Sequence, residues 1–260
     1  MFIPNMFKKI RIAILLFILF LVGGNAYLSQ KRVTDWDQSL AVVIYPINAD
    51  GSPFTANYVA SLTLDVFKPV EQFLQTEGIR FNLELDDPVI MDLAPEIKTL
   101  PPSPPFGADM FAIMWWSLQL RYWAWKYDTY SGPLTNIQVF VLFHDPEVSG
   151  QLDHSLGLEK GHIVMVNAFA TRHQASRSNV IIVHEMLHTL GATDKYDLQT
   201  LQPSYPGGYA DQEKEPLLPQ EYAEIMGGVI PLSASESKMP DSLAYTVVGP
   251  ITAKEIKWLK

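Results

Sequence analysis

Five residues in the second half of the chain have the types and spacing that are typical of a metal site. His184, Glu185, His188, Gly191 and Asp194 form the pattern H-E-x-x-H-x-x-G-x-x-D. On a helix, residues four apart lie on one face about 6 Å apart along the axis, so the two imidazoles can converge on a single ion. Imidazole and carboxylate groups are common zinc ligands. The pattern therefore predicts a zinc site.

The residues between the histidines and after them have chemical roles in this interpretation. Glu185 lies about 100° around the helix from His184, which places its carboxylate beside the ion, where it can take a proton from a metal-bound water. Gly191 is where the helix would end, because glycine accepts the left-handed conformation at C′. The reversal could bring Asp194 back as the third ligand. Three protein ligands leave a fourth position for water, as in a catalytic site with one zinc ion.

Other residues could replace Asp194 as the third ligand. The alternatives are carboxylates that follow the helix and the spare histidines: Asp197, Glu213, Glu221, Glu224, His144, His154, His162 and His173. For each spare histidine, an ordinary polar position at a strand end or in a loop is the simpler interpretation. A buried helix without a metal is the remaining alternative, although two histidines and a glutamate are expensive to bury on so apolar a helix.

Residues 184–194 resemble the zinc-binding signature of the metzincin clan of metallopeptidases, in the variant with aspartate as the last ligand, as in the snapalysin family. The resemblance implies that His184, His188 and Asp194 bind zinc and that Glu185 is the catalytic base. Residues 191–197 (GATDKYD) also resemble the G-T-x-D-x-x-Y motif of the aspzincins, more weakly, because residue 192 is alanine. Elsewhere the match is one of layout.

The resemblance implies supporting roles for two further segments. In residues 223–228 (AEIMGG), Met226 resembles the methionine of the turn beneath the zinc, although an ordinary core methionine is the alternative. Metzincins also bind extended substrate along an edge strand just before the zinc helix. The resemblance gives this role to Ile163, Val164, Met165, Val166 and Asn167; an ordinary internal strand is the alternative.

Length and composition limit the fold and the chemistry. The chain has 260 residues, of which 48% are hydrophobic, and this suffices for one domain with a real core or a domain with a small second lobe. It has no cysteine, which excludes a disulfide scaffold, a cysteine nucleophile and a cysteine-based zinc site. It also lacks G-x-S-x-G and a phosphate-binding glycine loop.

The pattern of apolar segments predicts an α/β fold. Strands are expected over residues 41–47, 80–86, 137–144 and 161–169, and helices over 55–76 with a kink or break at Pro69, over 109–127, from Ser176 or Ser178 through the histidines, and from Thr252 to 260. Residues 87–107 and 197–222 are expected to be loops, the second either a lid or an irregular surface segment. The resemblance implies a metzincin-like zincin fold: a twisted, mixed, mostly parallel sheet, an active-site helix at the floor of a cleft and a smaller C-terminal subdomain.

The helix expected over residues 109–127 is rich in tryptophan. It contains Trp115, Trp116, Trp123 and Trp125. A role in the core is the expected one, and a membrane-interface or substrate-groove role is the alternative.

Residues 1–30 have the layout of a targeting segment. Lys8, Lys9 and Arg11 precede the apolar residues 12–22, and no acidic residue occurs before Asp35. A cleaved signal peptide is one interpretation; an uncleaved membrane anchor through residues 12–28 is the other, with an N-terminal core helix as a weaker alternative. In the first two cases residues 31–260, the expected metallopeptidase catalytic domain, are exported to the periplasm or the extracellular space.

The charge balance excludes one class of partner. The net charge is −9, and removal of residues 1–26 would lower it to −12, so nothing basic remains to bind a nucleic acid. Together these features predict a zinc-dependent endopeptidase that cleaves peptide or protein substrates outside the cytoplasm. The alternatives are a zinc hydrolase of a cell-envelope amide and a non-catalytic envelope binding protein with a metal site. The sequence leaves the oligomeric state open.

Overall fold

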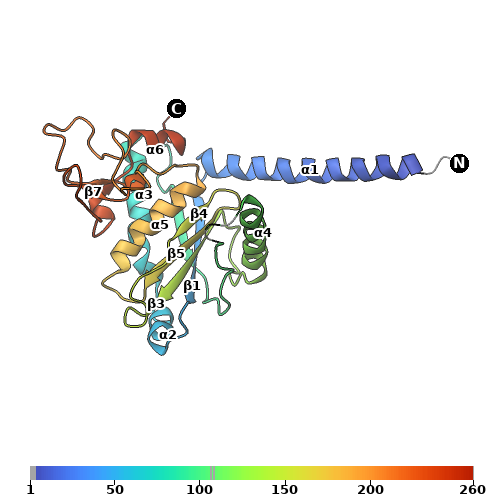
Figure 1. Cartoon of the computed structure of the whole chain (residues 1–260), viewed down its shortest axis with the longest axis horizontal. Helices are drawn as coiled ribbons and strands as arrows, with labels where there is room; N and C mark the ends of the chain where they lie inside the picture. The colour runs from blue at the N-terminus through green and yellow to red at the C-terminus, as the bar shows by residue number, and fades with distance from the viewer. Residues whose placement is uncertain (1–3, 106, 108, 260) are drawn as a thin grey trace.

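The molecule has an α/β fold that is built around one mixed sheet of five strands. The computed structural model describes residues 4–105, 107 and 109–259. The five strands follow the order β2-β1-β3-β5-β4 (Figure 1). They are β1 (Leu40–Asn48), β2 (Val89–Leu93), β3 (Ile137–His144), β4 (Leu156–Leu158) and β5 (Ile163–Phe169). The first four in spatial order are parallel and β4 is antiparallel to β5, which confirms the mostly parallel α/β sheet.

Helices cover both faces of this sheet. Successive side chains of a strand point to opposite faces, so buried apolar strands present apolar residues on both. Val42 and Ile44 of β1 join one buried cluster, together with α3 (Lys68–Arg80) and α5 (Ala175–Thr189). Val43 and Tyr45 join the other, together with α4 (Met110–Lys126). The helix that carries the H-E-x-x-H residues therefore packs on one face of the sheet, and the tryptophan-rich helix packs on the opposite face (Figure 1).

The helical segment before β2 is divided, as the proline predicted. It consists of α2 (Pro53–Ala60), the 3-10 turn η1 (Leu64–Val66) and α3, whose first turn contains Pro69. Proline fits a first turn because its missing N–H has no partner there. The cap differs from the expected one: Ser52 accepts from the backbone N–H of Thr55, so α2 begins before Thr55.

Two expectations between α3 and α4 are wrong. Residues 80–86 form no strand, because α3 continues to Arg80 and the chain then turns at Asn82, where φ is 57°. Leu83 and Leu85 pack against the core without joining the sheet. Conversely, the proline-rich segment 87–107 contains β2, which pairs with β1. The alternation of apolar residues in segment 80–86 therefore indicates contact with the core and does not indicate pairing in a sheet.

The first helix of the chain, α1 (Pro4–Thr34), projects from the domain (Figure 1). Its end enters the core, where Val33 is buried. Leu15, Phe17 and Phe20 are exposed, so α1 is not a core helix. Within the described residues, no helix combines the length and the apolarity that crossing a membrane requires. Residues 1–3 of the predicted targeting segment lie outside the described residues.

The chain after α5 contains little regular structure. It has two small two-stranded sheets, β6-β9 and β7-β8, and a short helix, α6 (Pro250–Glu255). The elements are β6 (Ala223–Glu224), η2 (Ile225–Gly227), β7 (Ile230–Pro231), β8 (Ser237–Lys238), η3 (Leu243–Tyr245) and β9 (Thr246–Val247).

Two expected helix starts are wrong. The first residue of α5 is Ala175, and its N-cap, Gln174, makes no side-chain cap bond, so neither Ser176 nor Ser178 caps it. The closing helix begins at Pro250, and Thr252 lies inside it. The Thr252 hydroxyl instead donates to the buried Glu224 carboxylate at 2.7 Å. Lys260, the end of the expected helix, lies outside the described residues.

Glu77 on α3 links the sheet layer to the C-terminal segment. Its buried carboxylate accepts from the backbone N–H of Val248 at 2.6 Å and pairs with Arg80. Arg80 in turn donates to the carbonyl of Val248. Residue 248 is fully buried, so its backbone groups have no access to water. A single carboxylate thus holds a buried part of the chain that lacks a sheet partner.

We expect Glu77→Ala to lower the free energy of unfolding by about 2 kcal/mol, because it leaves the buried N–H of Val248 without a partner. Glu84→Ala removes an exposed glutamate a short distance along the chain and should change stability by less than about 0.5 kcal/mol. Urea denaturation of both variants measures the difference. Equal stability of the two would show that the link contributes nothing.

Candidate metal centre

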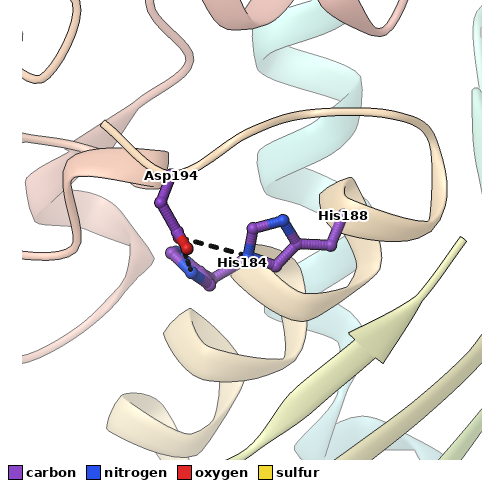
Figure 2. Close-up of side chains that lie close together, drawn as sticks. All are labelled: His184, His188 and Asp194. Atoms are coloured by element: carbon purple, nitrogen blue, oxygen red, sulfur yellow. Dashed lines mark ion pairs between the residues drawn. The ribbon is translucent and has the colours of Figure 1, made fainter. Parts of the chain in front are cut away.

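The predicted ligands come together at the end of α5. His184 and His188 lie on the helix, and Gly191, with φ at 101°, reverses the chain after it as the sequence predicted. Asp194 returns over the two rings (Figure 2). One of its carboxylate oxygens, Oδ1, lies 3.2 Å from Nε2 of His184 and 3.2 Å from Nε2 of His188.

These three residues can hold a metal ion. Their candidate ligand atoms all lie within 4.8 Å of one another, and within the described part of the chain they are the one group of three or more such residues that does. Two imidazole nitrogens and a carboxylate oxygen form a donor set that transition metals such as zinc accept.

Backbone carbonyls orient both imidazoles. Nδ1 of His184 lies 2.8 Å from the carbonyl oxygen of Ile225, and Nδ1 of His188 lies 2.8 Å from that of Ala192. A carbonyl oxygen only accepts, so Nδ1 carries the proton in each ring. In the neutral rings Nε2 then has a free lone pair, and both Nε2 atoms face Asp194. Such outer hydrogen bonds are typical of metal-binding histidines.

The electrostatics of the three groups also suit a cation. Burial alone would raise the pKa of Asp194, but hydrogen bonds and charge from His184 and His188 outweigh it and lower that pKa. Burial likewise opposes the charge on His188, and its hydrogen bond with Asp194 outweighs this and raises the His188 pKa. Positive charge is therefore favoured at the point where the three side chains meet.

Glu185 lies beside the three candidate ligands and does not belong to their group. Its side chain is buried, and this burial raises its pKa, although the neighbouring histidines act in the opposite direction. It lines a cavity of about 580 Å³ together with His184 and Tyr196. A carboxylate with a raised pKa at the wall of a cavity is a stronger base than an exposed one. The role of Glu185 as catalytic base stays a prediction.

The cavity is lined by both apolar and polar residues. Its lining includes Val180, Ile181, Leu198, Leu201, Val229 and Met239, and the polar residues Asp153, His154, Ser155 and Asn167. Tyr196 also lines the cavity, and burial, followed by the charge of Asp194, raises its pKa to about 12. The phenol therefore keeps its proton at neutral pH and remains a hydrogen-bond donor. Of the long segment 197–222, Leu198 and Leu201 reach the cavity.

The methionine-containing segment lies under the centre. Met226 is fully buried in η2, and the carbonyl that accepts from His184 belongs to the preceding residue, Ile225. The carboxylate of Glu224 accepts from the backbone N–H groups of Met226 and Gly227 at 2.7 and 2.9 Å. The segment thus supports the site through its backbone, and Glu224 is occupied there instead of serving as a ligand.

The other alternative ligands lie elsewhere. His162 is buried with Nδ1 3.3 Å from the carbonyl of Thr189, and His144 faces the side chain of Asn167 at 3.1 Å. Asp197 accepts from the backbone N–H groups of Gln199 and Thr200 in a turn. His154, His173, Glu213 and Glu221 are likewise outside the group of three.

The expected edge strand is wrong. Residues 163–167 belong to β5, which lies between β3 and β4 and is mostly buried. The edge is β4, whose Leu156–Leu158 pair with Met165, Val164 and Ile163. A β-carbon on Gly157 would lie 2.2 Å from the carbonyl oxygen of Glu185, so only glycine permits this close approach to α5. Three residues containing a glycine give no recognisable strand pattern, and β4 was therefore missed.

A clamp from α6 holds the loop that carries Asp194. The carboxylate of Glu255 accepts from the backbone N–H of Thr193 at 3.0 Å, from its hydroxyl at 2.8 Å and from Nζ of Lys195 at 2.6 Å. Lys195 is buried, and its backbone N–H donates to the carbonyl of Met226. Both neighbours of Asp194 are thus fixed by one distant glutamate, which the sequence pattern did not indicate.

We expect the wild-type domain to hold about one metal ion per chain when zinc is supplied, and Asp194→Ala to lose it, because the two histidines alone make an incomplete set. Asp197→Ala removes a nearby aspartate that the structure engages in a turn, and it should retain the ion. Metal content after gel filtration checks both. An ion retained in Asp194→Ala would place the third ligand elsewhere.

We expect Glu255→Ala to weaken metal affinity about 10- to 100-fold without removing a ligand, because the loop of Asp194 loses its support. Glu236→Ala, at an exposed position, is the control and should leave the affinity unchanged. Competition with a chromophoric chelator measures both affinities. Equal affinities would mean that Asp194 is held by other contacts.

No protein-family model and no curated protein sequence matches the chain. The interpretation of this centre therefore depends on its own geometry.

Proposed function

We propose that the chain is a zinc-dependent endopeptidase of the metzincin type, with His184, His188 and Asp194 as zinc ligands and Glu185 as catalytic base. One observation carries the proposal: a buried glutamate with a raised pKa stands beside two Nε2 atoms and a carboxylate that converge, and this glutamate lines a cavity together with His184. A purely structural metal site has no use for such a base. The pattern H-E-x-x-H-x-x-G-x-x-D agrees with this assignment.

The side chains divide the work of peptide hydrolysis. Zinc, when bound, acts as a Lewis acid that polarises the scissile carbonyl and makes water more acidic. Glu185 takes a proton from the attacking water and later gives it to the leaving amine. Tyr196 keeps its phenolic proton at neutral pH, so its hydroxyl is the donor that can stabilise the negative oxygen formed on the substrate.

The cavity and the edge of the sheet favour an extended peptide as substrate. The backbone of β4 lies at the sheet edge beside α5, where an extended chain can add as a further strand. The apolar residues Ile181, Leu198 and Leu201 in the lining of the cavity suit an apolar side chain of that peptide. We therefore assign substrate alignment to β4 and not to β5.

We also infer that the domain works outside the cytoplasm, in the periplasm or the extracellular space. Lys8, Lys9 and Arg11 precede the apolar residues 12–22, as in segments that direct export. The net charge of −9 and the absence of cysteine are compatible with this location.

We expect Glu185→Gln to retain zinc and to lower peptide cleavage about 10²- to 10⁴-fold, because the variant keeps the shape of the site and loses the base. Glu213→Gln, in the exposed loop after the site, is the matched control and should cleave as the wild type does. Cleavage is followed on a mixed-sequence peptide library, with zinc content measured on the same samples.

Two results would contradict the proposal. One is unchanged cleavage by Glu185→Gln. The other is a zinc-loaded wild type that cleaves no peptide in the library, which would favour another amide substrate or a binding role. Removal of the metal by a chelator should abolish cleavage, and added zinc should restore it.

A further inference from the structure

Helix α4 is apolar on both sides, although only one side packs against the sheet. Trp116, Leu120, Trp123 and Ala124 are buried against β1, β3 and β5. The opposite side carries large apolar residues that are each more than half exposed. These residues, which we call the α4 face, are Phe111, Met114, Trp115, Leu118, Tyr122 and Trp125. Their spacing of three and four residues places them on one side of the helix.

The α4 face is too large to be an ordinary surface feature. At roughly 200 Å² for each large side chain, the exposed parts present about 800 Å² of largely apolar surface. Phe111 is 81% exposed and Trp125 is 74% exposed. Soluble monomers rarely leave a contiguous apolar area of this size open. Something is therefore expected to cover the α4 face in the working protein.

The α4 face is separate from the metal centre. α4 packs on one face of the sheet and α5 packs on the other, so the sheet lies between the α4 face and the metal ligands. The cavity beside Glu185 includes no residue of α4. A role in the substrate groove, one alternative that the sequence left open, is thereby excluded, and what covers the α4 face need not block the site.

The position of α1 indicates what that cover is. Figure 1 shows α1 leaving the domain on the side where α4 lies, with α4 running across the direction of α1. Leu15, Phe17 and Phe20 of α1 are exposed apolar residues as well. Helix α1 thus projects from the side of the domain along which α4 lies, and both helices carry exposed apolar residues.

Charge and composition of α4 agree with a lipid surface. In a chain with a net charge of −9, residues 110–126 contain Arg121 and Lys126 and no acidic residue. Nζ of Lys126 lies 6.0 Å from the ring centre of Tyr122, at the border of the α4 face. Tryptophan and tyrosine prefer the level of the lipid headgroups, and basic residues beside them attract anionic lipids. A contact between two protein copies would not require this combination.

We propose that the α4 face lies on the surface of a lipid bilayer, at headgroup depth, on the side of the domain from which α1 leaves. The α4 face is an interfacial contact and does not cross the bilayer. It orients the domain so that α5 and the cavity point away from the lipid. This proposal does not depend on the peptidase assignment, because none of the residues of the α4 face belongs to the metal centre.

The tryptophans of the chain provide the test. Of six tryptophans, Trp115 and Trp125 are exposed, and Trp36, Trp116, Trp123 and Trp258 are buried. The full chain is mixed with vesicles of phosphatidylcholine and phosphatidylglycerol, and fluorescence is quenched either by a lipid spin-labelled at the headgroup or by iodide in the water. The double variant Trp115→Phe, Trp125→Phe keeps the α4 face apolar, so subtracting its signal isolates the two exposed tryptophans.

We expect the signal of these two residues to shift to shorter wavelength on vesicles, to be quenched by the labelled lipid and to lose its quenching by iodide. Quenching by iodide alone would show that the α4 face points to water and would overturn the proposal, as would a full chain that binds no vesicle. Protection from both quenchers would mean that protein covers the α4 face, and a second copy would then be detected as a dimer.

A second variant keeps the reporters and changes the contact. Phe111→Gln with Leu118→Gln makes the α4 face more polar, and the lipid quenching of Trp115 and Trp125 should be lost or strongly reduced. Ile79→Gln with Val148→Gln changes two equally exposed apolar residues away from α4 and should leave the quenching as in the wild type. Equal quenching in both variants would refute the α4 face as the contact.

Discussion

Two backbone carbonyls decide the chemistry of the candidate centre. By accepting from Nδ1 of His184 and His188, the carbonyls of Ile225 and Ala192 leave both Nε2 atoms free to face Asp194. Either ring could otherwise rotate or carry its proton on the wrong nitrogen. The two carbonyls belong to segments that follow α5, so the helix alone cannot make the site. The position of the two histidine rings therefore depends on the contacts that hold these two segments in place.

Three glutamates hold much of the chain after α5 in place, because this part of the chain has few hydrogen bonds from regular helices or sheets. Glu77 joins α3 to Val248, Glu224 collects the N–H groups of Met226 and Gly227, and Glu255 fixes both neighbours of Asp194. Each carboxylate accepts several hydrogen bonds that would otherwise be missing in a segment without a sheet partner. Burial of the Glu77 and Glu224 carboxyl groups is tolerated because their oxygens accept hydrogen bonds.

The sequence predicted the centre better than its surroundings because the ligands are close along the chain. His184, His188 and Asp194 lie within one helix and the loop that follows, so their spacing alone indicates their meeting. Glu255 is some 60 residues from the loop it clamps, and no local pattern reveals such a contact. The edge strand was misplaced because β4 has only three residues and a glycine at its centre. Apolar and polar residues alternate over residues 80–86, but the apolar side chains contact the core from a turn. The pattern alone does not distinguish such a turn from a strand.

The clamp by Glu255 makes the candidate centre depend on the C-terminal helix. Glu255 lies on α6, and its carboxylate accepts hydrogen bonds from Thr193 and Lys195, the two neighbours of Asp194. A change that loosens α6 would therefore act on the position of Asp194 and leave the two histidines on α5 where they are. The loop of Asp194 is thus the point at which a segment some 60 residues further along the chain can influence metal binding.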